Sequence, residues 1–198
     1  MTRPLGTSGA TPTPERELVS RAQAGDVNAF EQLAGAYADR LYMVVLRLVG
    51  DRGEAEDVVQ EALLRAWRGI GRFRGRSMFF TWLYRIGVNE ANRALQKRGR
   101  AGSSVPVEAG ALQLPAPPNE GPARQAEHEE LRQALDLAIA ELAPPYRTAL
   151  VLRDIEGLST REAAEIAGVG EAAFKSRLHQ ARMKVRAALS DAALVAAT

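Results

Sequence analysis

Apolar residues recur along the first part of the chain at the spacing that places side chains on one face of an α-helix. The recurring residues are Leu18, Ala22, Phe30, Leu33, Tyr37, Leu41, Val45 and Leu48. Glycines interrupt the pattern at Gly25–Asp26 and again between Gly50 and Gly53, and such clusters typically end helices. Asp26 is a suitable N-cap for the long helix that follows. The pattern predicts an all-α fold.

Two further helices are predicted before residue 98. The first carries Ala55, Val58 and Trp67 on its apolar side, and the segment from Gly69 to Gly75 closes it. The second runs from about Thr81 to Lys97, with Thr81 or Ser77 as its N-cap. The segment between these helices is rich in aromatic residues.

The C-terminal part shows a second helical block. One helix, which carries Leu131, Leu135, Leu137, Ile139 and Leu142, is expected to end at Pro144 and Pro145. Another runs from Tyr146 to Ile155. Ser159 and Glu162 then form a capping box, and Gly168-Val169-Gly170 supplies a tight turn. The last helix buries Phe174, Leu178, Ala181, Val185 and Leu189. This order is typical of a helix-turn-helix.

Prolines and glycines without helical periodicity separate the two blocks. We therefore predict two small helical domains joined by a flexible Pro/Gly-rich linker. The expected boundaries are a disordered tail at 1–14, a first domain at 15–98, the linker at 99–125, a second domain at 126–190, and a tail at 191–198. As a free coil the linker would place its ends roughly 30 Å apart, and it could extend to at most ~90 Å.

Charge is unevenly distributed along the chain. Ten basic residues and only Glu90 as an acid lie between Leu63 and Arg100, a net charge of +9, whereas residues 26–62 and 101–143 each carry −5. The basic segment also contains Phe73, Phe79, Phe80 and Trp82. Basic side chains with interleaved aromatic rings are typical of binding to single-stranded nucleic acid. The alternative is that the rings belong to the core, for which Trp82 is the strongest candidate.

Several classes of function find no support in the composition. The chain has no cysteine, which excludes disulfides, zinc–cysteine sites and thiol catalysis. Its two histidines, His128 and His179, are too few for a histidine-based metal site. We find neither a phosphate-binding glycine loop nor a nucleophile–base pair. We therefore expect no catalytic residues, no metal and no cofactor. No segment has the apolar length of a signal peptide or a membrane span, so we expect a cytoplasmic protein without membrane insertion.

The sequence DVVQEALLRAW, followed by FRGRSMFFTWLYRIGVN, resembles region 2 of the extracytoplasmic-function (ECF) group of bacterial sigma factors. In the C-terminal block, KSRLHQAR resembles the signature of sigma region 4. The resemblance implies that residues 15–98 bind core RNA polymerase and melt the −10 promoter element. It implies that residues 126–190 recognise the −35 element.

The resemblance also implies roles for individual residues. The residues placed at the polymerase contact are Asp57, Gln60, Glu61, Leu64 and Arg65. Those placed at the −10 element and its melting are Phe73, Ser77, Met78, Phe79, Arg85, Asn89, Asn92 and Arg93. Those placed at the −35 element are Thr160, Arg161, Lys175, Ser176, Arg177, His179, Gln180 and Arg182. Asn89 and Asn92 can both donate to and accept from base edges, whereas Arg85 and Arg93 suit phosphates. The expected partners are core polymerase, duplex and melted promoter DNA, and an anti-sigma protein.

Two other interpretations remain open at this stage. A free-standing helix-turn-helix regulator accounts for residues 126–189 but leaves the basic aromatic segment and the acidic 54–64 helix face without a role. A helical adaptor that does not contact nucleic acid disagrees with the charge distribution, and an enzyme is disfavoured for the reasons given above. Two DNA elements one and a half turns apart are ~50 Å distant, which is further than the ends of the linker lie as a free coil. The linker is therefore either held extended along the polymerase or a plain tether, and the sequence does not separate the two.

Overall fold

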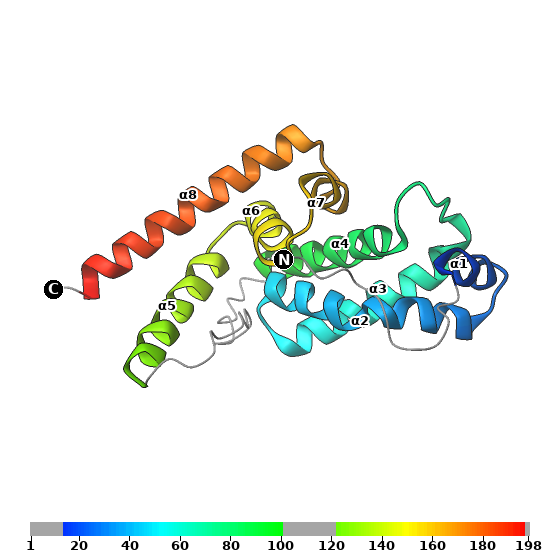
Figure 1. Ribbon diagram of the computed structural model, residues 1–198, viewed down its shortest axis with the longest axis horizontal. Helices are drawn as coiled ribbons and strands as arrows, with labels where there is room; N and C mark the ends of the chain where they lie inside the picture. The colour runs from blue at the N-terminus through cyan, green and yellow to red at the C-terminus, as the bar shows by residue number, and fades with distance from the viewer. Residues whose placement is uncertain (1–13, 101–121, 197–198) are drawn as a thin grey trace.

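The computed structural model describes residues 14–100 and 122–196, and within them the chain is entirely α-helical apart from turns (Figure 1). The helices are α1 (Glu15–Gln23), α2 (Val27–Val49), α3 (Arg52–Gly69), α4 (Phe79–Arg100), α5 (Pro122–Ala140), α6 (Pro144–Leu150), α7 (Thr160–Ala167) and α8 (Glu171–Ala196). A 3₁₀ turn, η1 (Ile70–Arg72), follows α3, and a π-helical turn, η2 (Val151–Ile155), extends α6. The predicted all-α fold is confirmed.

Local caps begin several helices where the sequence places them. The Asp26 carboxylate accepts a hydrogen bond from the Ala29 amide at 3.1 Å and begins α2. Ser159 and Glu162 form the predicted capping box of α7. The start of α4 differs from the prediction, because its first amide, that of Phe79, donates to Glu15 of α1 at 3.3 Å. Thr81, one of the two predicted caps, is buried inside the helix instead.

Three helix ends extend beyond the predicted boundaries. The helix α4 continues through Arg100, and α5 already begins at Pro122, so both ends of the predicted linker are helical. Proline suits the first turn of a helix, because the amide it lacks has no partner there. The helix α8 runs to Ala196 and includes most of the predicted C-terminal tail, whose alanines favour helix. Residues 1–13 and 101–121, on which the predicted N-terminal tail and most of the linker fall, lie outside the described ranges.

The helices α1 to α4 form an N-terminal bundle around α2. The C-terminal half of α2 contributes Leu41, Val44, Val45, Leu48 and Val49 to the core, all almost fully buried. Gly87 of α4 lies against Leu41, and a Cβ at this glycine would approach the Leu41 Cδ1 atom to 2.7 Å. The glycine therefore permits the close approach of α4 to α2.

The helices α5 to α8 form a C-terminal unit that contains the predicted helix-turn-helix. Gly168 ends α7 with a φ of +68°, which allows the turn into α8. Phe174, Leu178 and Ala181 of α8 are buried, as predicted. In α5, Ile139 and Leu142 enter the core, but Leu131 and Leu137 are exposed. The unit thus holds α7 and α8 together through the apolar side of α8.

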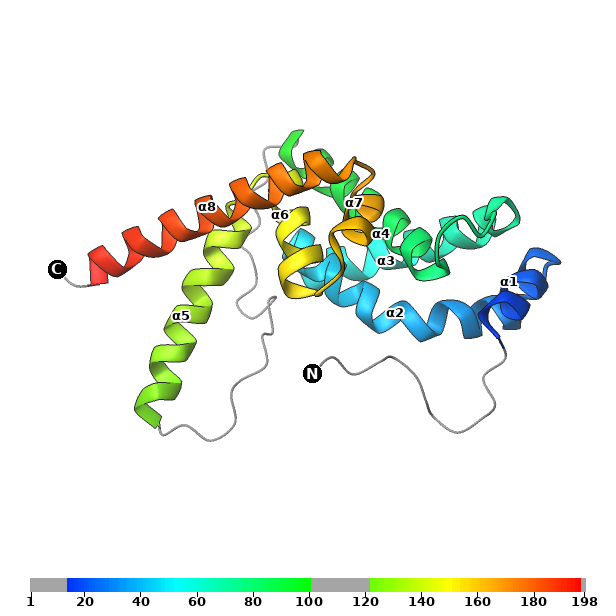
Figure 2. The same cartoon turned by 45° about the horizontal axis from the view of Figure 1, so that its top comes forward.

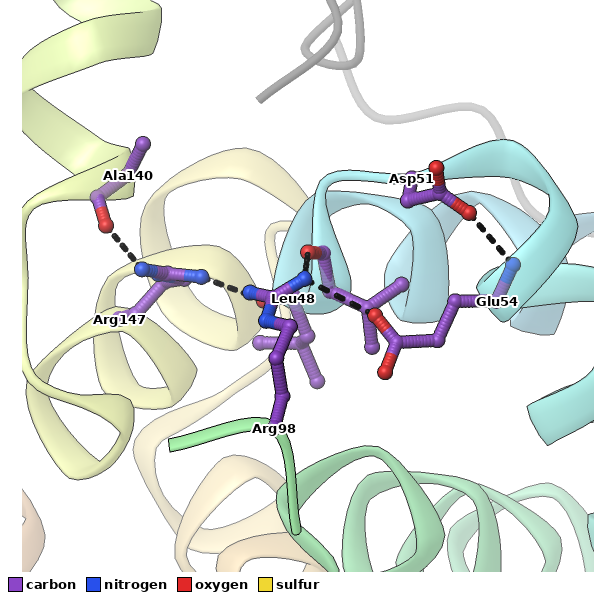
Figure 3. Close-up of polar contacts among 7 residues, drawn as sticks. Leu48, Asp51, Glu54, Arg98, Ala140 and Arg147 are labelled. Atoms are coloured by element: carbon purple, nitrogen blue, oxygen red, sulfur yellow. Dashed lines mark hydrogen bonds and ion pairs between the residues drawn. The ribbon is translucent and has the colours of Figure 1, made fainter. Parts of the chain in front are cut away.

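The two units pack against each other, with α7 beside α4 in both views (Figures 1 and 2). Arg147 of α6 is the central polar contact: its guanidinium is buried and donates to backbone carbonyls of both units (Figure 3). The acceptors are Ile139 O at 3.1 Å, Leu142 O at 3.2 Å, Ala140 O, and Leu48 O of α2 at 2.6 Å. Four hydrogen bonds compensate for burying this charge.

A second polar contact between the units is formed by Glu156, which follows η2. Its carboxylate pairs with Arg40 at 3.0 Å and with Arg47, both in α2, and its backbone carbonyl accepts from Arg40 at 2.8 Å. Only 6% of the Glu156 side chain is exposed. Water therefore screens this ion pair less than a surface pair, and losing one partner is correspondingly costly.

Replacing Glu156 by glutamine should loosen the packing of the two units, because Arg40 and Arg47 then lack a charged partner in a poorly hydrated site. We expect a loss of about 3 kcal/mol of docking free energy. Since the chain has no cysteine, dyes on Ala36→Cys and Ala187→Cys would report the distance between the units by energy transfer. Glu156→Gln should increase that distance.

Asp154→Asn is the matched control for this measurement. Asp154 pairs with Arg182 at 2.6 Å within the C-terminal unit, so its loss should leave the distance between the units unchanged. An unaltered distance in Glu156→Gln would show that the ion pair does not hold the units together.

Candidate DNA and polymerase interfaces

The five residues predicted to contact polymerase lie along the exposed side of α3, between two grooves. Gln60 and Leu64 face an apolar groove of about 490 Å³ between α2 and α3. Asp57, Glu61 and Arg65 line a polar groove of about 640 Å³ between α3 and α4. Leu64 is 49% exposed. The structure therefore brings these residues together on one side of α3, with apolar and charged contacts side by side.

Sequence reasoning missed the residues that form the apolar groove. Val27 is exposed at its edge, and Phe30 and Trp67 lie in its wall with their ring centroids 5.2 Å apart. An exposed apolar groove of this kind indicates an interaction surface. The helical period of α2 and α3 indicates apolar faces but does not show which of their residues remain uncovered.

Several charged residues of the polar groove form ion pairs with one another. Arg65 donates to Glu61 at 2.6 Å and lies 3.3 Å from Glu90, which in turn pairs with Arg93 at 2.5 Å. Glu90 is buried, so this network connects α3 to α4. Arg93, predicted to meet phosphates, is held by Glu90 in this conformation. Asp57 and Gln60 are exposed on α3.

The connection between α3 and α4 lies next to α1, at the end of the molecule opposite the C-terminal end of α8 (Figure 1). A cavity of about 340 Å³ opens between this loop and α1, and Phe73, Ser77 and Met78 line it. Met78 is 59% exposed. Three of the residues predicted to melt DNA thus surround one concave site.

Phe79, the fourth predicted residue of this loop, has a different place. Its side chain is 0% exposed and packs edge-on against Phe73, with ring centroids 5.9 Å apart. Trp82 stacks beside both rings, at 5.1 Å from Phe73 and 5.7 Å from Phe79. Phe79 therefore belongs to the core under the loop, and its predicted contact with a base does not fit its position. The half-buried Trp82 belongs to the same ring cluster.

The remaining residues predicted for the −10 element lie on α4 and face the C-terminal unit. Asn89, Asn92 and Arg93 line a cavity of about 700 Å³ between the units, together with Arg177 of α8. The Oδ1 atom of Asn92 is buried there without a hydrogen-bond partner among the described residues. Arg85 lies beside the α7–α8 turn. Its Nη2 atom is 4.0 Å from the position that a Cβ atom would occupy if Gly168 had a side chain. Docking of the units thus half-buries Asn92, whereas Arg85, Asn89 and Arg93 remain exposed beside the C-terminal unit.

The residues predicted for the −35 element divide into two groups. Lys175, Ser176, His179 and Gln180 are all exposed along one side of α8, and Arg161 is exposed on α7. Thr160 is half-buried at the start of α7, and Arg177 is half-buried beside α4. Arg182 donates to Asp154 at 2.6 and 2.9 Å, which raises the pKa of its guanidinium. The exposed side of α8 is available to a DNA groove, whereas Arg182 is paired with Asp154 and Arg177 faces the cavity beside α4.

Two residues of α1 also reach the candidate DNA site without having been predicted. Glu15 contacts the start of α4, and Gln23 contacts the start of the loop. No local sequence signal identifies them, because their partners lie between 47 and 64 residues further along the chain. Among the described residues, no group of three potential metal ligands comes together. Within the same ranges, no helix has the length and apolar character needed to cross a bilayer.

The geometry defines a helical DNA-binding protein, with a helix-turn-helix unit packed on a bundle that carries a basic aromatic loop. The family Sigma-70 region 2 matches residues 33–101, and the family Sigma-70, region 4 matches residues 132–185. The chain belongs to the sigma-70 family of RNA polymerase sigma factors, and it is of the ECF type. Its function as a sigma factor follows from this membership.

Relatives extend the similarity over most of the chain. The RNA polymerase sigma-H factor of Pseudomonas aeruginosa is 36% identical over 180 residues, which cover 88% of this chain and 93% of the relative. The ECF RNA polymerase sigma-E factor of Escherichia coli K12 is 38% identical, with 85% and 90% covered.

Solved structures show the same fold. CnrH in complex with the cytosolic domain of CnrY is similar with a TM-score of 0.65 and 26% identity, over 89% of this chain and 97% of that chain. The sigma factor RpoE of Bartonella quintana, in complex with the anti-sigma factor NepR, has a TM-score of 0.62 and 27% identity. That match covers 83% of this chain and 98% of RpoE.

Phe79→Ala should destabilise the N-terminal bundle by about 3–5 kcal/mol, because it leaves a cavity in the ring cluster. Thermal denaturation of the purified chain would measure this loss. Met78→Ala, one residue away but exposed, should change stability by no more than about 0.5 kcal/mol. Equal melting temperatures for the two variants would contradict the buried position of Phe79.

Proposed function

We propose that this sigma factor binds core RNA polymerase through α3, opens the −10 element with the α3–α4 loop and α4, and reads the −35 element with α8. The protein makes and breaks no covalent bonds in this role and acts in the cytoplasm. The observation that carries the proposal is the presence of three separate surfaces on one chain. The exposed side of α3, the loop cavity and the exposed side of α8 involve different residues.

The polymerase contact is supported by the residues around α3. The apolar groove offers Leu64 and Val27 as exposed apolar contacts, while Asp57 adds an exposed carboxylate at the edge of the polar groove. Apolar burial at the centre of an interface supplies affinity, and charges at its rim supply steering and register. A basic helical partner would satisfy both features.

Strand opening is supported by the loop cavity and its surroundings. A base inside the duplex stack offers only its edges, so opening requires a site that receives an unstacked base. Phe73, Ser77 and Met78 supply an apolar surface and a hydroxyl at such a site. Arg72, Arg74 and Arg76 are exposed on the same connection and suit the phosphates of the displaced strand. Asn89, Asn92 and Arg85 would extend this contact along α4.

Contact with both promoter elements requires the two units to separate. In the docked arrangement, Asn92 of α4 and Arg177 of α8 are half-buried where they line one cavity between the units. The −10 and −35 elements lie about one and a half turns apart, ~50 Å, taking ~34 Å per turn. We infer that polymerase binding replaces the contacts of Arg147 and Glu156 and frees the inner side of α4.

An anti-sigma protein is a further expected partner. Two similar structures were solved as complexes, that of CnrH with CnrY and that of RpoE with NepR. The exposed apolar groove between α2 and α3 offers such a partner a surface on the docked form of this chain. Because the polymerase is proposed to use the same groove, the two partners would compete.

The double variant Asp57→Lys with Gln60→Ala should abolish binding to core polymerase, because it reverses one charge and removes one contact at the proposed interface. Its circular dichroism should stay unchanged, since both side chains are exposed. A pull-down with purified core polymerase measures binding. Asp39→Lys, an exposed charge reversal on α2, serves as the control and should bind normally. Retained binding by the double variant would defeat the assignment of α3.

Lys175→Ala should reduce the discrimination between cognate and scrambled −35 DNA, because Lys175 lies on the exposed side of α8 where bases are read. Arg161→Ala should instead weaken binding evenly and reduce the slope of log affinity against log salt by about 1. Binding of reconstituted holoenzyme to both DNAs over a salt series measures both effects. Equal losses on both DNAs for Lys175→Ala would remove its role in reading bases.

A further inference from the structure

The helix α1 forms one wall of the cavity at the α3–α4 loop, opposite the residues proposed to receive a base. Val19 and Gln23 of α1 face Phe73, Ser77 and Met78 across about 340 Å³. These α1 residues precede the loop by about fifty positions and belong to no motif of the basic aromatic segment. Their contacts with the loop determine its shape.

Gln23 fixes the beginning of the loop. Its Nε2 group donates to the carbonyl of Ile70 at 3.1 Å and to that of Phe73 at 2.7 Å. These two carbonyls bracket the turn η1, which is itself closed by a hydrogen bond of 3.0 Å from the Phe73 amide to Ile70 O. Both donors of one side-chain amide are therefore used to hold the point at which the chain leaves α3.

Glu15 fixes the end of the loop. Its Oε1 atom accepts from the Phe79 amide at 3.3 Å, the first amide of α4, and its Oε2 atom accepts from the Tyr37 hydroxyl at 2.8 Å. A carboxylate at a helix N-terminus is favourable, because the unpaired amides there carry partial positive charge. Burial, together with the neighbouring Glu15, raises the pKa of Tyr37 to about 12, so the phenol remains protonated and donates at neutral pH.

We propose that Gln23 and Glu15 are positioning residues for strand opening, because they hold residues 74–78 at both ends in the shape that receives an unpaired base. The proposal rests on the role given above to the loop. A loop that is ordered before DNA arrives loses less conformational entropy on binding. Part of the capacity to open a promoter therefore lies in α1, outside the segment that touches the strand.

The variant Gln23→Met tests this proposal, because it removes both donors while keeping the length of the exposed side chain and adding no charge. Holoenzyme reconstituted with each variant is assayed for opening of a promoter selected with the wild-type holoenzyme. Gln23→Met should open the duplex about tenfold more slowly, in line with the loss of two hydrogen bonds. Gln32→Met, the same substitution at an exposed position of α2, should open it at the wild-type rate.

A second measurement separates positioning from a general structural effect. Premelted promoters carrying a single abasic site at each position of the −10 strand are bound to wild-type and variant holoenzyme. At the position where the wild-type holoenzyme captures a base, removal of that base lowers the affinity of the holoenzyme for the promoter. In Gln23→Met, the loss of affinity caused by the abasic site should be about tenfold smaller, because the misplaced loop no longer binds the base. Core affinity and −35 binding should be unchanged.

Tyr37→Phe provides an independent variant, since it removes the hydroxyl that holds Glu15 without substituting any residue of the loop or of α1. It should show the same reduced sensitivity to the abasic site. If both variants open the promoter at the wild-type rate and keep full sensitivity to the abasic site, the positioning role is wrong. If the wild type is indifferent to every abasic site, the failure lies instead with base capture by the loop.

Discussion

The C-terminal end of α2 is the constraint on which the rest of the structure depends. Its last carbonyls have no partner within the helix, and they lie where the two units meet, so they require donors from elsewhere. Arg147 donates to Leu48 O at 2.6 Å and Arg98 to Val49 O at 3.1 Å (Figure 3). Burial lowers the pKa of Arg147 to about 10, which still leaves it cationic at neutral pH. Because Arg147 also binds carbonyls at the end of α5 and just after it, one side chain fastens both units.

This attachment decides which functional surfaces are open. It places α7 against α4, which half-buries Asn92 of α4 and leaves the Lys175 side of α8 exposed. A partner can shift such an equilibrium only by binding the separated form more tightly than the docked form. We propose that polymerase does so by offering the two units separate positions. On this proposal, the energy that exposes α4 comes from polymerase binding at α3 and not from DNA.

The sequence predicts those features that local chemistry determines. The caps at Asp26 and Ser159 and the buried Phe174 follow from residues a few positions apart, and the structure confirms each of them. The remaining features depend on contacts between distant residues. Glu15 begins α4 across 64 positions, and Glu156 pairs with α2 across more than 100. The pattern FRGRSMFF indicates an aromatic loop but does not show that Phe79 points inward while Met78 points outward. The same limit applies to Arg182, whose partner Asp154 lies 28 residues earlier.

The distribution of positive charge has a physical consequence for strand opening. Three of the basic residues counted between Leu63 and Arg100 are paired within the bundle: Arg65 with Glu61, Arg93 with Glu90, and Arg98 with Glu54 at 2.9 Å. The Arg98–Glu54 pair and the 3.3 Å contact of Arg65 with Glu90 connect α4 to α3. The paired arginines contribute little free charge. Arg72, Arg74 and Arg76 are exposed on the loop, beside the cavity that α1 helps to form. Each phosphate that a cation neutralises adds to affinity. The exposed arginines of the loop lie beside the cavity that is proposed to hold a base. On the proposed function, attraction of the strand and capture of the base therefore occur at one place, and the rigidity of that place depends on α1.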